Sequence, residues 1–362
     1  MKKVGIIGAG QLGQMLGFAA QGLGIECVFL DPSSDPPAAI CGPVLRFPFD
    51  SDEGLRQLVA QTDLITYEFE NVPVTATEAI ARTTPVFPPP LALRHAQDRL
   101  AEKKLFEKLN IPVPAFRTVD SEADLRTACK EIGFPVVLKT RRLGYDGKGQ
   151  TIVRSEAAIG DALLEVGSDD LIAEQWIAFD MEVSAIGARN VSGETAFYAL
   201  THNQHQDGIL SVSRAPAETN SLETEANDLL LRLLQDLEYV GVMALELFVV
   251  GDRLMANEFA PRVHNSGHWT IEGAETSQFE NHLRAILDMP LGATGMLGYA
   301  GMLNLIGDVP VTMRALTLPG CELHDYGKQP RKGRKLGHVS VLSEHAAGRD
   351  AALQQLGKLL IN

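Results

Sequence analysis

The stretch Gly241–Trp269, GVMALELFVVGDRLMANEFAPRVHNSGHW, carries two glutamates, Glu246 and Glu258, in two consecutive apolar runs. Apolar, β-branched and aromatic residues predict a strand on each side of the turn signal Gly251-Asp252, so the stretch is a predicted hairpin. An unpaired carboxylate buried in a sheet is costly. Two hard oxygen ligands facing one cleft suit Mg²⁺, whose remaining ligands come from substrate phosphates. A surface hairpin with two solvated glutamates is the alternative, and this stretch alone favours neither.

The spacing of the two glutamates constrains the hairpin. In regular pairing around a two-residue loop, Glu246 would face Asn257, and Glu258 would lie on the opposite side of the sheet. One cation could not then contact both carboxylates. A shared metal site therefore predicts a three-residue loop or a β-bulge, which sets Glu246 opposite Glu258 with Cβ atoms about 5 Å apart.

A candidate phosphate-binding segment lies upstream. Lys139 ends an apolar strand predicted at 135–139, and the glycine-rich loop Gly144–Gly149 follows it. A strand lysine can neutralise phosphate oxygens while backbone N–H groups of such a loop close over them. The loop is not a Walker P-loop, because G-x-x-x-x-G-K-[ST] occurs nowhere in the chain. For an isolated loop of this kind, a hairpin turn with surface lysines is the alternative.

The N-terminus predicts a βαβ unit. A strand at Lys3–Ile7 is followed by the turn Gly8–Gly13, a helix at 14–23 and a second strand at Glu26–Leu30, directly before Asp31. A G-x-G-x-x-G turn with an acidic residue about 20 positions later is the dinucleotide-binding fingerprint. Taken alone, this unit favours an NAD-dependent dehydrogenase, an alternative that leaves the later segments unexplained.

Length and composition set wider limits. The 362 residues have room for roughly two or three domains. No apolar run approaches the roughly 18 residues of a membrane helix, and the formal charge of −14 argues against nucleic-acid binding. The four cysteines show no CxxC pairing and are expected to be free thiols. We expect a cytoplasmic protein with small-molecule partners and without a membrane or nucleic-acid partner.

Taken in chain order, these segments resemble the ATP-grasp superfamily. They comprise a strand lysine, a glycine-rich hairpin, Glu174–Ile177 with Glu182 close behind, and Glu246 with Asn257-Glu258. Five longer motifs resemble one family within it, the 5-(carboxyamino)imidazole ribonucleotide synthases, and the likeness runs from the first strand to the last. These motifs are Gly8–Met15, Thr66–Pro73, Gly144–Gln150, Asn257–Trp269 and Gly333–His338.

The resemblance implies a fold of mixed α/β and α+β class with three domains and an appendage. A Rossmann-like βαβ domain is expected at 1–95, and a linker helix with a small lid domain at 96–177. A large mixed α+β ATP-grasp domain is expected at 178–295, and a small β-rich appendage at 296–362. The resemblance also implies a homodimer.

The resemblance further implies an ATP-dependent carbon–nitrogen ligase of de novo purine synthesis. Such an enzyme uses ATP, Mg²⁺ and bicarbonate to carboxylate the amine of 5-aminoimidazole ribonucleotide through carboxyphosphate, with ADP and phosphate released. It reassigns the N-terminal glycine turn from NAD to the ribonucleotide site. Two alternatives stay open: another acyl-phosphate ligase, such as a formate-using glycinamide ribonucleotide transformylase, and a nucleotide-sensing module without turnover.

Specific residues inherit roles from the resemblance. A basic cluster near residues 328–335 is, on an acidic chain, a plausible clamp for a monophosphate. The metal ligands are Glu246 and Glu258, and the catalytic residues are Asp146, which guides the amine proton, Arg262 and His264. The implied ATP-binding residues are Arg99, Lys139, Gly144, Tyr145, Asp146, Gly147, Lys148, Gly149, Gln150, Glu174, Gln175, Trp176, Ile177, Glu182, His205, Asn257 and Glu258. The implied substrate-binding residues are Gln11, Leu12, Glu70, Tyr145, Arg262, His264, Asn265, Ser266, Lys328, Arg334 and Lys335.

Overall fold

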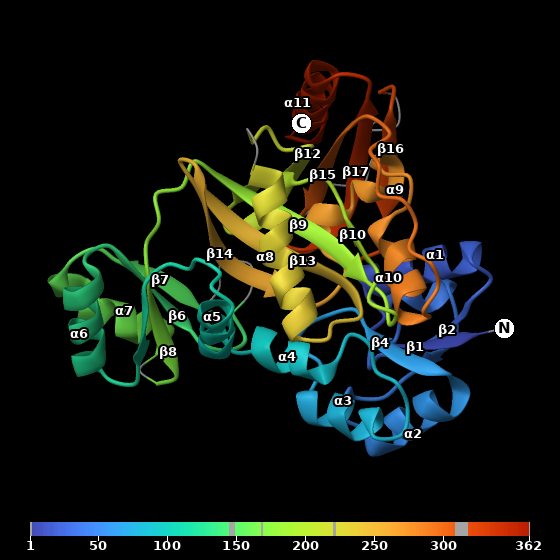
Figure 1. Ribbon diagram of the computed structural model, residues 1–362, viewed down its shortest axis with the longest axis horizontal. Helices are drawn as coiled ribbons and strands as arrows, with labels where there is room; N and C mark the ends of the chain where they lie inside the picture. Colours follow the sequence, from blue (N-terminus) through green and yellow to red (C-terminus); the bar gives the residue numbers. More distant parts are fainter. Residues whose placement is uncertain (1, 145–148, 168, 220–221, 308–317, 362) are drawn as a thin grey trace.

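The computed structural model of the chain describes residues 2–144, 149–167, 169–219, 222–307 and 318–361. Three sheets organise these residues. Figure 1 shows a small α+β unit on one side, the N-terminal βαβ unit on the other, and a large sheet between and above them. In the described ranges, no helix is long and apolar enough to cross a membrane.

The N-terminal unit contains a parallel sheet of four strands in the order β3-β2-β1-β4. Glycine turns and short helices connect the strands in βαβ fashion, as the sequence predicts. Its elements are β1 (Lys3–Ile7), α1 (Gln11–Gly22), β2 (Glu26–Leu30), β3 (Val44–Leu45), α2 (Asp52–Gln61), β4 (Leu64–Tyr67) and α3 (Val74–Ala81).

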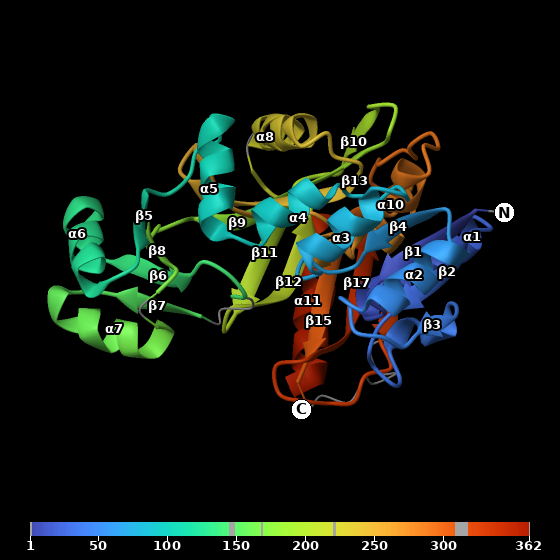
Figure 2. The same ribbon diagram turned by 90° about the horizontal axis from the view of Figure 1, so that it is seen from below.

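The small unit, which we call the lid domain, has an antiparallel sheet in the order β5-β8-β6-β7. Two helices cover one face of this sheet and bury a separate apolar core that includes Leu125, Leu138 and Ile159. Figure 2 shows the lid standing clear of the rest of the molecule. Its elements are β5 (Phe116–Val119), α6 (Glu122–Ile132), β6 (Val136–Thr140), β7 (Gln150–Val153), α7 (Ile159–Val166) and β8 (Leu171–Gln175).

The large unit contains a sheet of nine strands, eight of them in the order β14-β13-β9-β11-β12-β15-β17-β16, with β10 paired to β9. Its strands are β9 (Met181–Arg189), β10 (Thr195–Phe197), β11 (Thr201–Gln206), β12 (Ile209–Ala215), β13 (Gly241–Val250), β14 (Arg253–Ala260), β15 (Tyr299–Ile306), β16 (Cys321–Asp325) and β17 (Lys335–Ser343). Its helices are α8 (Leu222–Asp236), α9 (Thr270–Gly273), α10 (Gln278–Ile286) and α11 (Ala346–Ile361).

Two helices, α4 (Pro90–Ala96) and α5 (Arg99–Lys108), connect the units. Asp98 caps α5 by accepting from Leu100 N, and its carboxylate also pairs with Arg141 and Arg142 at the base of the lid. Farther along α5, the fully buried Lys103 donates to Asn257 O at 2.6 Å. The linker helix therefore ties the lid to β14.

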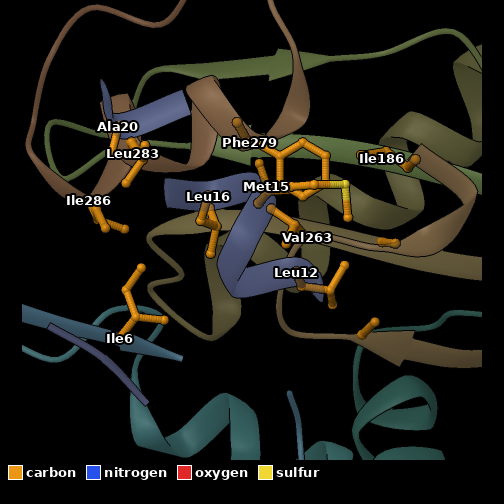
Figure 3. Close-up of a cluster of buried hydrophobic side chains, with 14 of the residues drawn as sticks. Ile6, Leu12, Met15, Leu16, Ala20, Ile186, Val263, Phe279, Leu283 and Ile286 are labelled. Carbon is orange, nitrogen blue, oxygen red and sulfur yellow. The ribbon is translucent and has the colours of Figure 1, made fainter. Parts of the chain in front are cut away.

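One apolar core crosses the boundary between the N-terminal and large units. Leu12, Met15 and Leu16 of α1 share one cluster with Phe279 and Leu283 of α10, and Met15 lies against the ring of Phe279 (Figure 3). Burial of apolar side chains contributes roughly 25 cal/mol per Å², so a shared core holds the two units in a fixed relation. The start of α1 is thereby fixed relative to the large sheet.

The structure departs from the sequence prediction in several places. Helix α1 begins at Gln11, within the predicted turn Gly8–Gly13, and not at residue 14. The sequence also predicts one strand at 194–202, where the structure has two, β10 and β11. The segment after residue 295 is β-rich as predicted, but its strands extend the large sheet: β15 pairs with β12, β17 with β15, and β16 with β17. The final helix α11 was not predicted, because its apolar residues do not follow a clear helical period.

Candidate functional site

A cavity of about 510 Å³ lies where the three units meet. Lys139 reaches it from the lid, Glu246 and Glu258 from the large sheet, and Gln11 from the start of α1. Its wall combines polar and charged side chains with apolar and aromatic ones, a composition typical of sites for small polar ligands. It is the candidate active site.

The hairpin β13–β14 sets its two glutamates face to face. A two-residue turn of Gly251 and Asp252 pairs Val250 with Arg253. A bulge then shifts the register, so that Glu246 pairs with Glu258. The predicted bulge is confirmed, whereas the three-residue loop offered beside it is not formed. The extra residue of a bulge lets both carboxylates lie on one face of the sheet.

The facing carboxylates differ in electrostatic state. Burial raises the pKa of Glu246 to about 7, and the charge of Glu258 adds to the rise. Burial also acts to raise the pKa of Glu258, but Arg99, whose Nη1 lies 2.9 Å from Glu258 Oε2, outweighs it and the pKa is lowered. His264 Nε2 lies 3.2 Å from Glu246 Oε1. Positively charged and imidazole groups therefore surround the carboxylate pair.

The donor set fits a hard divalent cation. Glu258 keeps 43% of its side chain exposed to the cavity, and Glu246 lines the same wall. Among the described residues, no group of three or more His, Cys, Asp or Glu side chains could hold a metal alone. Mg²⁺ is bound typically by one or two carboxylates plus substrate phosphates, so two facing glutamates are sufficient.

A buried ion pair joins the lid strand β6 to β8, whose end opens the segment 174–177 that we call the hinge. Lys139 Nζ lies 3.0 Å from Glu174 Oε2, and both side chains are largely buried. Burial lowers the pKa of Lys139, and Glu174 opposes that shift. Such a lysine is placed to neutralise phosphate oxygens at the cavity floor.

Behind the hinge, the cavity has an apolar wall suited to a flat ring. Trp176 is 41% exposed, and the rings of Phe179 and Phe248 stack with centroids 4.8 Å apart. All three line the cavity. Nearby, His205 Nδ1 pairs with a carboxylate oxygen of Glu182. Trp176 is a predicted site residue, whereas Phe179 and Phe248 are not. Isolated aromatic residues in strand-like runs also pack in protein cores, so the sequence does not mark these two as cavity residues.

Beyond the carboxylate pair, a second group of side chains faces the N-terminal unit. Arg262 pairs with Glu70, which lowers the pKa of Glu70 to about 2 although burial alone would raise it. Lys328 Nζ donates to Gln11 Oε1 at the start of α1. The two contacts connect residues far apart in the sequence and border one end of the cavity.

The same end contains a residue that sequence reasoning missed. Glu68 accepts hydrogen bonds from Gly10 N and Gly13 N, and Asp31 accepts from Ala9 N at 2.9 Å. In a dinucleotide-binding fold, these positions contact a pyrophosphate and a ribose. Here the carboxylates of Glu68 and Asp31 accept the hydrogen bonds of these backbone N–H groups. The sequence signal that could have identified Glu68 is its position two residues before Glu70, the one glutamate of the pair that was predicted as a site residue.

The side chain of Gln278 holds His264 in place through two hydrogen bonds to the His264 backbone. The buried amide of Gln278 accepts from His264 N at 2.9 Å and donates to His264 O at 2.6 Å. Burial lowers the pKa of His264 well below its usual range, and Arg262 adds to the effect. The imidazole is therefore neutral near pH 7, with Nδ1 2.8 Å from Ser266 Oγ.

Most predicted site residues line this cavity. Gly149, Ser266, Lys328 and Arg334 do not line it, although Ser266 and Lys328 contact residues that do. The predicted residues 145–148, namely Tyr145, Asp146, Gly147 and Lys148, lie outside the described ranges. The predicted residues in the wall are Gln11, Leu12, Glu70, Arg99, Lys139, Gly144, Gln150, Glu174, Gln175, Trp176, Ile177, Glu182, His205, Glu246, Asn257, Glu258, Arg262, His264, Asn265 and Lys335.

Three family models match the chain in order. Residues 1–97 match the ribonucleotide synthetase preATP-grasp domain, and residues 104–279 match the ATP-grasp domain. Residues 300–352 match the phosphoribosylaminoimidazole carboxylase C-terminal domain. The predicted ATP-grasp fold with a preceding N-terminal domain is thereby confirmed.

Similar proteins cover the whole chain. The N5-carboxyaminoimidazole ribonucleotide synthase of Pseudomonas aeruginosa is 47% identical, over 99% of both chains. A crystal structure of the synthetase from Thermus thermophilus is 46% identical, with a TM-score of 0.95 over 99% of both chains. The enzyme of Aspergillus clavatus, solved in complex with ADP and 5-aminoimidazole ribonucleotide, is 31% identical, with a TM-score of 0.93 over 100% of this chain and 99% of that one.

Proposed function

We propose the reaction from one premise: the chain belongs to the N5-carboxyaminoimidazole ribonucleotide synthase family of ATP-grasp ligases. It is an ATP-dependent ligase that carboxylates the amine of 5-aminoimidazole ribonucleotide in purine biosynthesis. One observation carries the assignment to this cavity. The facing pair of Glu246 and Glu258, the lid lysine Lys139 and the Arg262–Glu70 pair all line this one cavity.

The nucleotide binds between the lid and the large sheet. The adenine lies against the apolar wall made by Trp176, Phe179 and Phe248, and the hinge backbone of 174–177 presents hydrogen-bonding groups to its edge. Glu182 is the ribose ligand, with His205 beside it. The phosphates then extend toward Lys139 and the glycine-rich loop. Support comes from the presence of all these groups on the wall of one cavity.

Glu246 and Glu258 are the residues that would hold Mg²⁺. When bound, the cation would neutralise charge on the nucleotide phosphates. Until then, Arg99 compensates the charge of Glu258 at 2.9 Å. As the nucleotide binds, the Arg99 guanidinium can pass from the carboxylate to a phosphate oxygen, because both are bidentate acceptors.

The chemistry proceeds in two steps beside the γ-phosphate. An oxygen of bicarbonate attacks the γ-phosphorus as ADP leaves, which gives carboxyphosphate. The substrate amine then attacks the carbon of that intermediate, or of CO₂ released from it, to form the C–N bond, and phosphate leaves. Arg262 and Lys139 stabilise the developing negative charge, and catalysis is mainly positioning. Neutral His264, together with Asp146, is the candidate acceptor of the amine proton.

The ribonucleotide occupies the end of the cavity next to α1. Gln11, Leu12, Glu70 and Asn265 form its surroundings. Its monophosphate is bound by Lys328, Arg334 and Lys335. Support for this part is the contact between Lys328 and Gln11, which brings the basic segment to the start of α1.

The remaining features are proposed from family likeness and composition. We propose a homodimer from family likeness. We also propose a cytoplasmic location, since the four cysteines are free thiols, as is usual in reducing compartments. We also keep the domain boundaries at residues 95, 177 and 295.

An ADP-release assay tests the proposal. With 5-aminoimidazole ribonucleotide present, ADP release should require bicarbonate, and formate should not replace it. Release that depends on formate and glycinamide ribonucleotide would instead support the transformylase alternative. Nucleotide binding without any ADP release would support the sensing module.

A further inference from the structure

The glycine turn at the start of α1 is capped by a carboxylate from a distant strand. Gly10 is the N-cap residue of α1, and no N-cap side chain caps the helix. Instead Glu68, directly after β4, accepts from Gly10 N through Oε1 and from Gly13 N through Oε2, the latter at 2.6 Å. A capping box satisfies the same N-cap and N3 donors from within a helix. Glu68 supplies both acceptors from 55 to 58 residues away.

The glycines of the turn make room for this side chain. A Cβ at Gly8 would lie 2.5 Å from Glu68 Cγ, and a Cβ at Gly10 would lie 2.7 Å from Glu68 Oε1. In dinucleotide-binding folds, glycines here allow a pyrophosphate to reach the backbone N–H groups. Glu68 is only 7% exposed and fills that space. A negative group of the chain thus replaces the phosphate of a ligand.

The capped turn is connected to the ribonucleotide end of the cavity. Gln11, the first residue of α1, lines the cavity and accepts from Lys328 Nζ. Lys328 Nζ also lies 5.7 Å from the ring centroid of Tyr326, which is buried. Because α1 is fixed by the shared core, small changes at its first turn are transmitted to Gln11 rather than absorbed by the helix.

We propose that Glu68 is a positioning residue for the ribonucleotide site. By taking the place of an anion at the start of α1, it fixes Gln11 and, through Gln11, Lys328 at the edge of the cavity. The inference rests on the proposed function, since it takes the ribonucleotide as the ligand. Without Glu68, the Gly10 and Gly13 N–H groups lose their acceptor, and the turn no longer holds Gln11 in place.

Two variants test the proposal by steady-state kinetics. Glu68→Ala leaves a space that a small carboxylate can enter, whereas Glu68→Gln fills the space and turns an amide N–H toward a backbone donor. We expect the KM for 5-aminoimidazole ribonucleotide to rise about tenfold or more in both, and the KM for ATP to stay within about twofold. Acetate should restore the alanine variant but not the glutamine variant. Chloride at equal ionic strength should restore neither.

Glu26→Gln is the matched control, since Glu26 is exposed at the start of β2 and pairs with the surface residue Lys3. Three results would overturn the proposal: unchanged KM values, an equal rise in both KM values, or restoration by chloride as well as acetate. If Glu68→Ala does not fold, the KM values of Glu68→Gln decide alone. Failure of the proposed function is distinguishable, because the wild-type chain would then release no bicarbonate-dependent ADP.

Discussion

Glu246 on β13 lies directly opposite Glu258 on β14, although a two-residue turn alone would place these side chains on opposite faces of the sheet. The register shift after Glu246 corrects the alternation, and Asn257 is the extra residue. Two like charges directly opposite each other destabilise a hairpin. The site accepts this cost because Arg99 and His264 lie beside the carboxylates and a cation can bind between them.

The substitution Glu258→Gln should separate function from folding. The amide keeps an oxygen for Arg99 but removes a charge from the carboxylate pair. We expect ADP release to fall about 100-fold or more, and the thermal midpoint to stay unchanged or rise. The exposed helix residue Glu225 provides a matched control, since Glu225→Gln should change neither quantity. Full ADP release by Glu258→Gln would refute the metal site.

The basic segment 328–335 should act on one substrate only. Removing one charge-assisted hydrogen bond to a phosphate costs about 1.5 to 3 kcal/mol, so Arg334→Ala should raise the KM for the ribonucleotide at least about tenfold. The KM for ATP should barely change. Lys332→Ala, at an exposed position in the same segment, is the control. Equal damage to both KM values would contradict the assignment.

Lys328 should make ribonucleotide binding sensitive to pH. Burial lowers the pKa of Lys328 to about 8, and nearby Arg334 and Lys335 add to that shift while Glu68 opposes it. Since its unfolded value is higher, the lysine's contribution to stability is present at high pH and is lost as pH falls through about 8. Its contribution to binding has the opposite sign, because the neutral amine cannot pair with a phosphate.

The kcat/KM for the ribonucleotide should therefore fall as pH rises above about 8. In Lys328→Arg, the guanidinium stays charged, and the fall should move to higher pH. A pH profile of the arginine variant that coincides with the wild-type profile would exclude Lys328 as its origin.

The two hydrogen bonds between Gln278 and the His264 backbone can be tested by measuring stability and turnover together. Gln278→Leu leaves His264 N and O without their partner, which costs about 1 to 3 kcal/mol for each buried group. We expect a lower denaturation midpoint and a lower kcat. Gln235→Leu, on the exposed face of α8, should alter neither. A wild-type denaturation midpoint and a wild-type kcat in Gln278→Leu would show that these hydrogen bonds have no role.

Local pattern was enough to predict much of this molecule. The strands predicted at Lys3–Ile7 and Glu26–Leu30 agree with the structure residue for residue, because each is a short apolar run bounded by turn residues. The bulge followed from one physical requirement, that one cation contact both Glu246 and Glu258. The family motifs then indicated most of the residues that line the cavity.

Contacts between distant segments could not be predicted in this way. The role of Glu68 depends on a glycine turn more than 50 residues earlier, and no local pattern encodes that pairing. The stacking of Phe179 on Phe248 depends on β13 lying beside the hinge. Similarly, β15 joins the large sheet by pairing with β12, and β17 by pairing with β15, which the spacing of short glycine-rich strands does not specify.

Isotope transfer tests the central claim most directly. If bicarbonate attacks the γ-phosphate, then ¹⁸O-labelled bicarbonate should deliver one labelled oxygen to each inorganic phosphate released with 5-aminoimidazole ribonucleotide present, as measured by mass spectrometry. Glu258→Gln should slow the release of labelled phosphate about 100-fold or more. Phosphate that forms at the wild-type rate without ¹⁸O from bicarbonate would contradict carboxyphosphate formation at this site.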